Sequence, residues 1–349
     1  MLGVDAFRSA GGRLGEVVVP METALDRIAR TRAYRDGRLT REGFPIEDMS
    51  DYLAVAGTTV WIDLCAADAE DLKIVASELD LHELAVEDAL ETRQQPKLST
   101  YNDHQLISMY AVRLDRAVPQ IDLSVVNVFI TPAALVTVRD ESFDIDGVVR
   151  RWDTSPEMAD HGVGHLLYGL MDHVVDGHFD AVAAIDEELD NLEDQLFDTT
   201  SPGVDVQRRS FALRKSLVTL RRVVLPMREV VDPLRRRDLE VVDDALAPYF
   251  QSVYDHVLRV TESTESLRDM VSTILEMNLT LQANRLNVIT KKVTSWAAII
   301  AVPTAITGFY GQNLPYPGFS ETSGFIASSA LITVLSGGLY IAFRRRDWL

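Results

Sequence analysis

The carboxyl-terminal part of the chain holds two long stretches without a charged residue, although 25% of all residues are charged. Asp, Glu, Lys and Arg are absent from Val293 to Ser320 and again from Thr322 to Phe343. A helix of about twenty apolar residues spans the hydrocarbon core of a bilayer. We therefore predict transmembrane helices over 293–312 and 325–343, joined by an external loop over 313–324. A buried hairpin in a soluble domain is the alternative, but the length of each run favours the membrane.

Basic residues flank these stretches, whereas the loop between them carries neither Lys nor Arg. The positive-inside rule places both flanks, and therefore both termini, in the cytoplasm. No signal peptide is expected, because Met1–Pro20 lacks a basic region followed by an apolar core. We expect a multi-pass protein of the cell inner (plasma) membrane, with about 290 cytoplasmic residues before the first span. The flanking residues are Lys291, Lys292, Arg344, Arg345 and Arg346.

The overall charge restricts the partners of the cytoplasmic part. The formal net charge is -19, from 53 acidic and 34 basic residues. This balance disfavours nucleic acid and suits cations, although many soluble proteins are acidic only for solubility. The single cysteine, Cys65, excludes an internal disulfide and fits a reducing compartment.

Short alternating segments over 16–160 predict a cytoplasmic α/β domain of the usual size for one core, preceded by a mobile tail over 1–15. Runs of β-branched and apolar residues bounded by turn residues predict strands. Two segments between them have helix-start residues and helical patterning. The predicted strands are 58–64, 105–114, 124–130 and 134–138, and the predicted helices are 68–79 and 83–91.

A helical hairpin is predicted over 161–240. Apolar residues recur at helical spacing over 164–197 and again over 206–232, with Thr-Thr-Ser-Pro-Gly at 199–203 between them. Two helices joined by such a short turn form an antiparallel pair. The first helix is acidic and the second is basic. These charges predict pairing across the hairpin, pairing with a neighbouring subunit, or two solvated faces.

A third helical segment begins near Asp243 and has no internal glycine before Gly308. We assign 241–292 to a stalk that continues into the first transmembrane helix, a helix of about sixty residues and roughly 90 Å. One face, followed at steps of three and four, holds only small, polar or acidic residues, whereas the neighbouring faces are apolar. This polar face comprises Glu276, Thr280, Ala283, Asn287, Thr290, Thr294, Ala297, Ala301, Thr304 and Gly308.

The polar face permits two interpretations. Small residues alone would mark tight helix packing in lipid. Amide and hydroxyl groups inside a membrane helix need water or polar partners, and a ring of them lines an aqueous pore, which is the interpretation we favour. Two spans cannot surround a pore, so we expect a homo-oligomer with closed cyclic symmetry.

The segment Tyr310-Gly311-Gln312-Asn313 follows the polar face and would cap the outer mouth of the pore. We predict that Gly311 permits an unusual backbone conformation and that Asn313 contributes a ring of amide carbonyls. Mg²⁺ sheds its water reluctantly, so neutral oxygens that hold the hydration shell suit its entrance. The predicted selectivity filter is therefore Gly311, Gln312 and Asn313.

With this segment the sequence resembles the CorA family of divalent-cation channels, whose signature Tyr-Gly-Met-Asn closes the first of two carboxyl-terminal membrane helices. The resemblance covers most of the chain and implies an α+β/α membrane protein that assembles as a funnel-shaped homopentamer. It also implies passive, membrane-potential-driven uptake of Mg²⁺, or of Co²⁺ or Ni²⁺, as substrate, with no cofactor and no enzymatic activity. The matching segments are Leu84–Asp88, Arg93–Lys97, Leu166–Asp172, Pro226–Val230, Tyr249–Phe250, Val253–His256, Asn284, Asn287, Pro303–Thr304 and Trp348–Leu349.

Several residues depart from the family pattern near the pore. Gln312 replaces the signature's Met, which leaves the transported ion open, since similar proteins with Ile there look like zinc transporters. Glu321 is the only acid of the loop, so cations should be concentrated less strongly at the mouth. Thr290 and Ala301 stand where CorA-like channels often place bulky apolar gates, and Val293 is the remaining gate candidate.

The resemblance further implies that Mg²⁺ is a regulatory ligand bound between subunits in the cytoplasm. Glu87 and Asp88 match a Glu-Asp pair with this function in similar channels, and the implied set includes Asp172. The acid expected on the stalk is Ser252 here, with Asp255 about one turn further on. An ordinary solvated helix face explains Glu87 and Asp88 equally well.

Other motifs support no enzyme. His161, His165, His173 and His178 have no accompanying Cys, and we expect surface or packing histidines rather than a zinc cluster. No phosphate-binding Gly-rich loop is present. Two alternatives to Mg²⁺ conduction remain: Zn²⁺ transport by a protein of the same superfamily, and a membrane-anchored cation sensor that does not conduct.

Overall fold

The computed structural model describes residues 29–91, 95–115, 119–197, 203–312, 315 and 318–349. The predicted tail over 1–15 therefore lies outside the described residues. The chain divides into two compact units, each assembled from segments that are distant in sequence. Among the described residues, unit 1 holds 29–115, 121–183 and 218–264, and unit 2 holds 119–120, 184–217 and 265–349.

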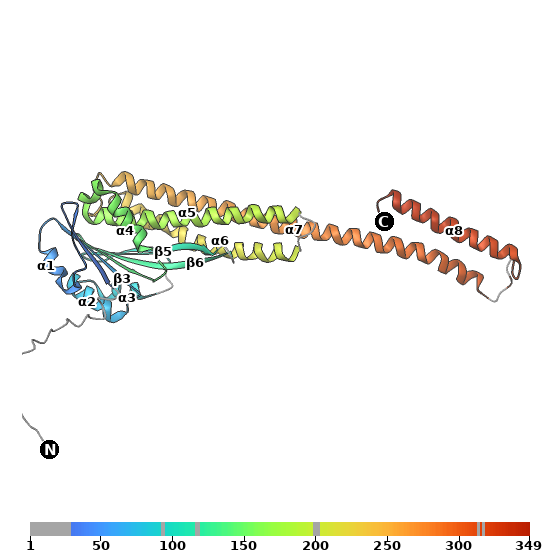
Figure 1. Ribbon diagram of the computed structural model, residues 1–349, viewed down its shortest axis with the longest axis horizontal. Coiled ribbons are helices and arrows are strands. Elements are labelled where there is room, and N and C mark those ends of the chain that lie inside the picture. The colour runs from blue at the N-terminus through green and yellow to red at the C-terminus, as the bar shows by residue number, and fades with distance from the viewer. Residues whose placement is uncertain (1–28, 92–94, 116–118, 198–202, 313–314, 316–317) are drawn as a thin grey trace, which may run out of the picture. The chain divides into compact units, whose positions relative to one another are not determined.

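Unit 1 is built on a mixed sheet whose seven described strands follow the order β2-β1-β3-β7-β6-β5-β4 (Figure 1). The central strands β3 and β7 are parallel, while β1 and β6 pair antiparallel with them on either side. The strands are β1 (Ala29–Arg35), β2 (Arg38–Glu42), β3 (Thr58–Cys65), β4 (Lys97–Thr100), β5 (Gln105–Asp115), β6 (Gln120–Ile130) and β7 (Ala134–Arg139).

Helices cover both faces of this sheet. One face packs against α1 (Met49–Leu53), α2 (Ala69–Leu79) and α3 (Glu83–Leu90). The other face packs against α4 (Ile145–Thr154) and the unit 1 parts of the long helices α5 to α7. Successive residues of a strand point to opposite faces, so Leu135 joins the second core and Val136 joins the first. Both faces are therefore apolar, as expected for a sheet between helical layers.

The predicted strands and helices of the α/β domain are confirmed by β3, β5, β6, β7, α2 and α3. Strands β1, β2 and β4 and helices α1 and α4 were not predicted. Strand β1 contains Arg30, Arg32 and Arg35, which is unusual for a buried strand. The guanidinium of Arg32 is buried and donates to Glu42 (3.0 Å) and Asp153 (2.9 Å). Carboxylates supplied by the fold thus satisfy a charge that the sequence pattern alone argues against.

Three long helices contribute to both units: α5 (Gly162–Phe197), α6 (Gly203–Arg235) and α7 (Ala247–Tyr310). In unit 1, α4 approaches α5 closely at Gly169, where a Cβ atom would lie 2.6 Å from Nε1 of Trp152. That Nε1 donates to the carbonyl oxygen of Leu166 (3.1 Å), and the Trp152 ring meets Trp61 edge to face at 4.8 Å. A side chain at position 169 would separate these contacts.

The predicted hairpin over 164–197 and 206–232 is confirmed by α5 and α6. In unit 2, leucines of both helices are buried, among them Leu189, Leu192 and Leu213. Arg209 of α6 donates to Glu188 of α5 at 2.5 Å, which confirms that charges pair across the hairpin.

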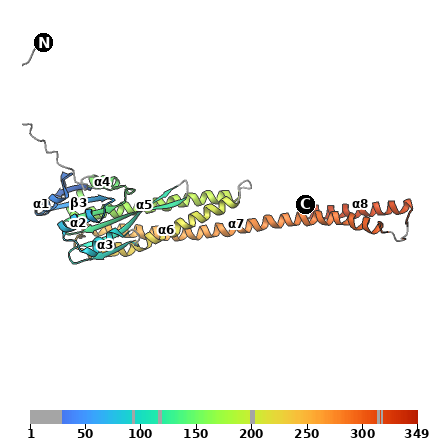
Figure 2. The same cartoon turned by 90° about the horizontal axis from the view of Figure 1, so that it is seen from below.

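Helix α7 and the final helix α8 (Thr322–Arg345) each contain a window long and apolar enough to cross a membrane. Only 6% and 0% of the residues in these windows are buried, whereas the core helices of a soluble protein bury such residues. This argues against the soluble-hairpin alternative. Figure 2 shows α8 returning along the last part of α7, in the opposite direction.

The predicted segment boundaries remain predictions. Helix α7 passes the predicted stalk-to-membrane boundary at 292/293 without interruption. Four residues of the external loop over 313–324, namely Asn313, Leu314, Tyr316 and Pro317, lie outside the described residues, and α8 already begins at Thr322.

Candidate functional site

The polar face of α7 is exposed along its whole length in the single chain. All ten of its members are exposed, from Glu276 to Gly308. At about 100° per residue they fall within an arc of roughly 120°. Amide and hydroxyl groups on such a stripe need water or other protein chains around them at membrane depth.

The less exposed side of the same span lies roughly 120–140° around the helix from the polar face. It includes Ser295, whose side chain is fully buried, and the partly shielded Val302 and Ile306. On α8, partly shielded residues such as Ile332 and Ser336 form a comparable stripe. The end of α7 and the start of α8 together line a cavity of about 390 Å³. Helix α8 thus accounts for one side of α7 and leaves the polar face uncovered.

Hydroxyl groups on the polar face present acceptor oxygens outward. The hydroxyl of Thr280 donates to the carbonyl of Glu276 (3.0 Å), and that of Thr304 donates to the carbonyl of Ile300 (3.0 Å). Since the hydroxyl hydrogen is used within the helix, the remaining lone pairs of the oxygen face away from the backbone. Such oxygens suit a hydrated cation.

The end of α7 explains the glycine of the predicted filter. The amide of Gly311 donates to the carbonyl oxygen of Thr307 (2.8 Å), and a Cβ at this glycine would lie 2.9 Å from that same oxygen. The φ angle of Gly311 is not positive, so the predicted unusual backbone conformation is wrong and the requirement for glycine is steric. Gln312 is exposed and its amide donates to the carbonyl of Phe309 (3.3 Å). Asn313 lies outside the described residues, and the filter as a whole stays a prediction.

The predicted gate and flank residues lie on exposed surface of α7 and at the end of α8. Val293 is 63% exposed, next to Thr294 of the polar face, and both Thr290 and Ala301 are exposed too. The gate at Val293 stays a prediction. The basic residues Lys291, Lys292, Arg344, Arg345 and Arg346 are all exposed, the last three at the end of α8.

In unit 1, Asp88 of α3 accepts two hydrogen bonds on one carboxylate oxygen. Nζ of Lys97 donates to Oδ2 at 2.7 Å, and the hydroxyl of Tyr101 donates to the same atom at 3.1 Å. Partial burial raises the pKa of Tyr101, and its hydrogen bond to Asp88 raises it further. Glu87, the neighbouring member of the predicted pair, is exposed.

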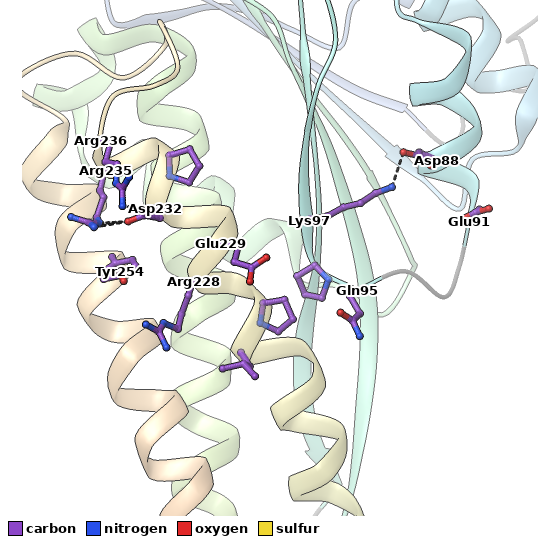
Figure 3. Close-up of a pocket in the computed structure, with 14 residues that line it drawn as sticks. Asp88, Glu91, Gln95, Lys97, Arg228, Glu229, Asp232, Arg235, Arg236 and Tyr254 are labelled. Carbon is purple, nitrogen blue, oxygen red and sulfur yellow. Dashed lines mark hydrogen bonds and ion pairs between the residues drawn. The ribbon is translucent and has the colours of Figure 1, made fainter.

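Asp88 and Lys97 stand at one side of a groove of about 1110 Å³ (Figure 3). The other side is formed by α6 and α7. There Asp232 and Arg235 of α6 form an ion pair. The guanidinium of Arg235 also lies 4.5 Å from the centre of the Tyr254 ring of α7. Further residues that line the groove are Glu91, Gln95, Pro96, Leu225, Pro226, Arg228, Glu229, Pro233 and Arg236.

Asp172 has a different cationic partner. Arg151 of α4 forms an ion pair with Asp172 and a second one with Asp176, one turn further along α5 (2.6 Å). Burial raises the pKa of Asp172, and attraction to Arg151 opposes that rise. The guanidinium therefore neutralises two carboxylates that are close to each other.

His256 of α7 joins this pair in a group that sequence analysis did not identify. One ligand atom each from Asp172, Asp176 and His256 lies within 4.8 Å of the others. Two carboxylates and an imidazole suit a transition metal, but here Arg151 already pairs with both carboxylates. The spacing of the two aspartates was a visible signal, whereas the approach of α7 required the fold.

The remaining regulatory candidate, Asp255, lies on an exposed face of α7 together with Ser252, which replaces the expected acid. Asp255 is exposed and accepts from the side-chain amide of Gln251 (2.9 Å), and Ser252 is exposed as well. The structure therefore does not bring Glu87, Asp88, Asp172 and Asp255 into one ligand group among the described residues. The prediction of a regulatory site between subunits stays a prediction.

Three of the four histidines, namely His161, His173 and His178, contact neighbouring residues in the described structure. His178 is fully buried, with Nε2 2.8 Å from the carbonyl oxygen of Tyr110. The ring of His173 packs edge to face on Phe143, and Nδ1 of His161 lies 2.5 Å from a carboxylate oxygen of Asp243. Within the described part of the chain, no metal-ligand group contains any of the four predicted histidines.

Comparison with known proteins gives a match over most of the chain. A family model described as CorA-like Mg²⁺ transporter protein matches residues 56–345. The cobalt/magnesium transport protein CorA of Thermotoga maritima is 28% identical over 302 residues, which cover 84% of this chain and 84% of that protein. The zinc transport protein ZntB of Yersinia enterocolitica is 22% identical over 259 residues, which cover 73% and 77%.

A solved structure supports the fold over nearly the whole length. The complete structure of the CorA magnesium transporter from Methanocaldococcus jannaschii matches with a TM-score of 0.76 at 22% sequence identity. The match covers 92% of this chain and 99% of that one. At this level of identity the similarity shows the fold, including the two carboxyl-terminal helices.

Proposed function

The chain belongs to the family of CorA-like Mg²⁺ transporter proteins, which transport divalent metal ions, and we propose that it conducts Mg²⁺ into the cell. In this proposal the ion, or alternatively Co²⁺ or Ni²⁺, moves passively down the membrane potential. The pore lies on the symmetry axis of a homopentamer, and the polar face of each α7 contributes one wall.

The observation that carries the proposal is the exposure of the polar face on the side of α7 away from α8. A helix that only anchors a protein has no need of Asn287, Thr290, Thr294 and Thr304 along one side. If several copies turn these faces toward a common axis, the polar groups meet water and the apolar sides meet lipid or α8. The number of copies, five, comes from the family resemblance.

The outer mouth follows from the order of residues after α7. Gly311 closes the last turn, so residue 313 of each subunit would enter the axis directly above the polar face. A ring of Asn313 carbonyl oxygens would hold a hydrated Mg²⁺ without stripping its water. By the positive-inside rule, the basic flanks support a cytoplasmic start of the first span and a cytoplasmic end of the second, with this mouth on the outer side.

Ion flux into liposomes tests the proposal. Purified protein in vesicles with an inside-negative potential should admit Mg²⁺ in a potential-dependent manner, with Zn²⁺ and Co²⁺ measured in parallel. Uptake of Zn²⁺ without Mg²⁺ would assign the chain to zinc transport instead. No flux of any ion would favour the non-conducting sensor.

The filter is tested by Asn313→Ala, with Gln312→Met as the matched control that restores the family signature. We expect Asn313→Ala to abolish selective uptake while the oligomer, measured by size-exclusion chromatography with light scattering, stays intact. Gln312→Met should retain Mg²⁺ uptake. Unchanged uptake and ion competition in Asn313→Ala would rule out the filter.

Regulation by internal Mg²⁺ is a separate part of the proposal. The double variant Glu87→Ala with Asp88→Ala should take up more Mg²⁺ than the wild type when internal Mg²⁺ is high. No change would favour an ordinary solvated helix face for these two residues.

Zn²⁺ transport is the second candidate because of one residue. Gln312 replaces the Met of the family signature at the proposed mouth, and a zinc transport protein is among the relatives. Oxygen ligands alone favour Mg²⁺, whereas binding of Zn²⁺ prefers imidazole or thiolate, and neither group is on the polar face.

A further inference from the structure

The two predicted regulatory carboxylates with a cation beside them differ in how that cation is held. At Asp88 an ammonium group, Nζ of Lys97 at 2.7 Å, forms an ion pair, with side-chain exposures of 35% for Lys97 and 27% for Asp88. At Asp172 the partner is the guanidinium of Arg151, which is shared with Asp176 and so anchored at two points. A lysine is a compact charge on a flexible stem, whereas an arginine bound to two carboxylates has a fixed geometry.

We propose that Lys97 is a built-in competitor that occupies Asp88 until a divalent cation displaces it, and so sets the cation concentration at which the site responds. The cation beside Asp172 is not displaced in the same way, because the guanidinium of Arg151 is bound to both Asp172 and Asp176. The inference rests on the proposed function in one respect, namely that Asp88 takes part in a regulatory cation site.

The surroundings of Asp88 fit a hydrated divalent ion. A carboxylate oxygen and the phenol oxygen of Tyr101 are 3.1 Å apart, and hard cations prefer oxygen ligands completed by water. The carboxylate of Asp88 lines an open groove, so a cation and its water have access from that side. Arrival of a divalent ion would turn Tyr101 from a donor toward Asp88 into a neighbour of the ion.

The groove offers other polar surroundings to the ammonium group of Lys97 once it is displaced from Asp88. It is the first residue of β4, with Pro96 before it, and its side chain extends toward Asp88 along the groove (Figure 3). The same groove is lined by the carboxylate of Glu229 and the amide of Gln95. A displaced ammonium therefore remains hydrated and faces another acid, so the exchange of one cation for another does not bury an unpaired charge.

The strength of this competition follows from the exposure of the pair. A partly exposed ion pair is weak, so removal of Lys97 should lower the half-saturating divalent concentration by about three- to fivefold rather than by orders of magnitude. The alternative is that Lys97 only ties β4 to α3. In that case its removal would lower stability at every cation concentration without moving the half-saturation point.

The experiment measures the thermal unfolding temperature of the full-length protein in nanodiscs as Mg²⁺ or Co²⁺ is titrated. Lys97→Met should reach half of its cation-induced shift at about three- to fivefold lower concentration than the wild type. Lys97→Arg, which keeps a cation, should not show this decrease. Lys73→Met is the matched charge control, because Lys73 is an exposed lysine of α2. Asp88→Asn should remove the cation-induced shift.

Each result decides the proposal. A lower unfolding temperature of Lys97→Met with an unchanged half-saturation point would overturn it in favour of the structural tie. A decrease in Lys73→Met equal to that in Lys97→Met would also overturn it, since bulk charge would then be the cause. Absence of any cation-induced shift in the wild type and in Lys97→Met, with Mg²⁺ flux intact in liposomes, would overturn the competition and leave conduction standing. The expected decrease without flux would support the competition while conduction failed.

Discussion

The beginning and the end of helix α7 show two solutions to the burial of apolar side chains. Phe250 near the beginning is fully buried in unit 1, between the sheet and two other long helices, and its ring meets Tyr168 edge to face. Phe309 near the end is 60% exposed in the single chain. The residue type and the helix are the same, so the difference lies in what surrounds them. Unit 1 completes its core within one chain, whereas the candidate membrane helices leave large apolar side chains such as Phe309 exposed in the single chain.

The largest expected effect is the difference in unfolding free energy between substitutions at the two ends of α7. Phe250→Ala should destabilise unit 1 by about 3–5 kcal/mol, because it removes a buried ring and leaves a cavity. Phe309→Ala, the matched variant in the same helix, should cost at most about 1 kcal/mol of the same unfolding transition. Chemical denaturation followed by tryptophan fluorescence measures both, since Trp61 and Trp152 lie in the unit 1 core. Equal destabilisation by the two variants would mean that the units do not have separate cores.

The same contrast explains which parts of the fold could be predicted from the sequence and which could not. The long helices and the membrane spans were predicted because periodic apolar residues and uncharged runs are properties of the local sequence. Strand β1 was not, because Arg32 is acceptable in a buried strand only when Glu42 and Asp153 reach it. Helix α4 was not predicted either, although its sequence carries the apolar spacing of a helix in Ile145, Val148, Val149 and Trp152, all of which are buried.

A second prediction concerns pH and unit 1. Burial lowers the pKa of His178 to about 4, against about 6.5 in an unfolded chain. Below pH 6.5 the unfolded chain binds a proton that the native state refuses, so stability falls with pH until about pH 4, by roughly 3 kcal/mol from this group. The uncharged span of α7 has no comparable group, so unit 1 should unfold before the membrane helices as pH falls.

His178→Gln provides the control for this prediction. Glutamine can still donate to the carbonyl of Tyr110 but does not titrate, so the loss of stability between pH 6.5 and pH 4 should become shallower. Denaturant midpoints measured across this pH range report the slope. An unchanged slope in His178→Gln would show that other groups cause the loss.

The smallest expected effect lies in the α5 and α6 segments of unit 2. Arg209→Met should cost about 0.5–1 kcal/mol, because the ion pair with Glu188 is partly exposed. Arg208→Met is the control, since Arg208 is an exposed residue of the same turn. Hydrogen exchange of α5 and α6 amides measures this local effect. An equal effect of both variants would attribute it to the net charge of α6 rather than to pairing across the hairpin.

The candidate site shows the same difference: features set by spacing within one helix could be predicted, whereas contacts between distant elements could not. The polar face was predicted from spacing within one helix; its members are exposed in the single chain, and the pore that they would line stays a prediction. The cations beside the predicted regulatory acids were not predicted, because Lys97 and Arg151 reach Asp88 and Asp172 from other elements. A list of acids in a sequence does not show which of them already have a partner.

The most direct test of the central account is the accessibility of the polar face during ion flux. Cys65 is the only cysteine, so a Cys65→Ser background allows Thr304→Cys on the polar face to be compared with Val302→Cys on the side toward α8. A cationic, water-soluble thiol reagent should modify Thr304→Cys and block Mg²⁺ flux into liposomes, and should leave flux through Val302→Cys unchanged. Flux that survives complete modification at position 304, or that is blocked only at position 302, would contradict a pore lined by the polar face.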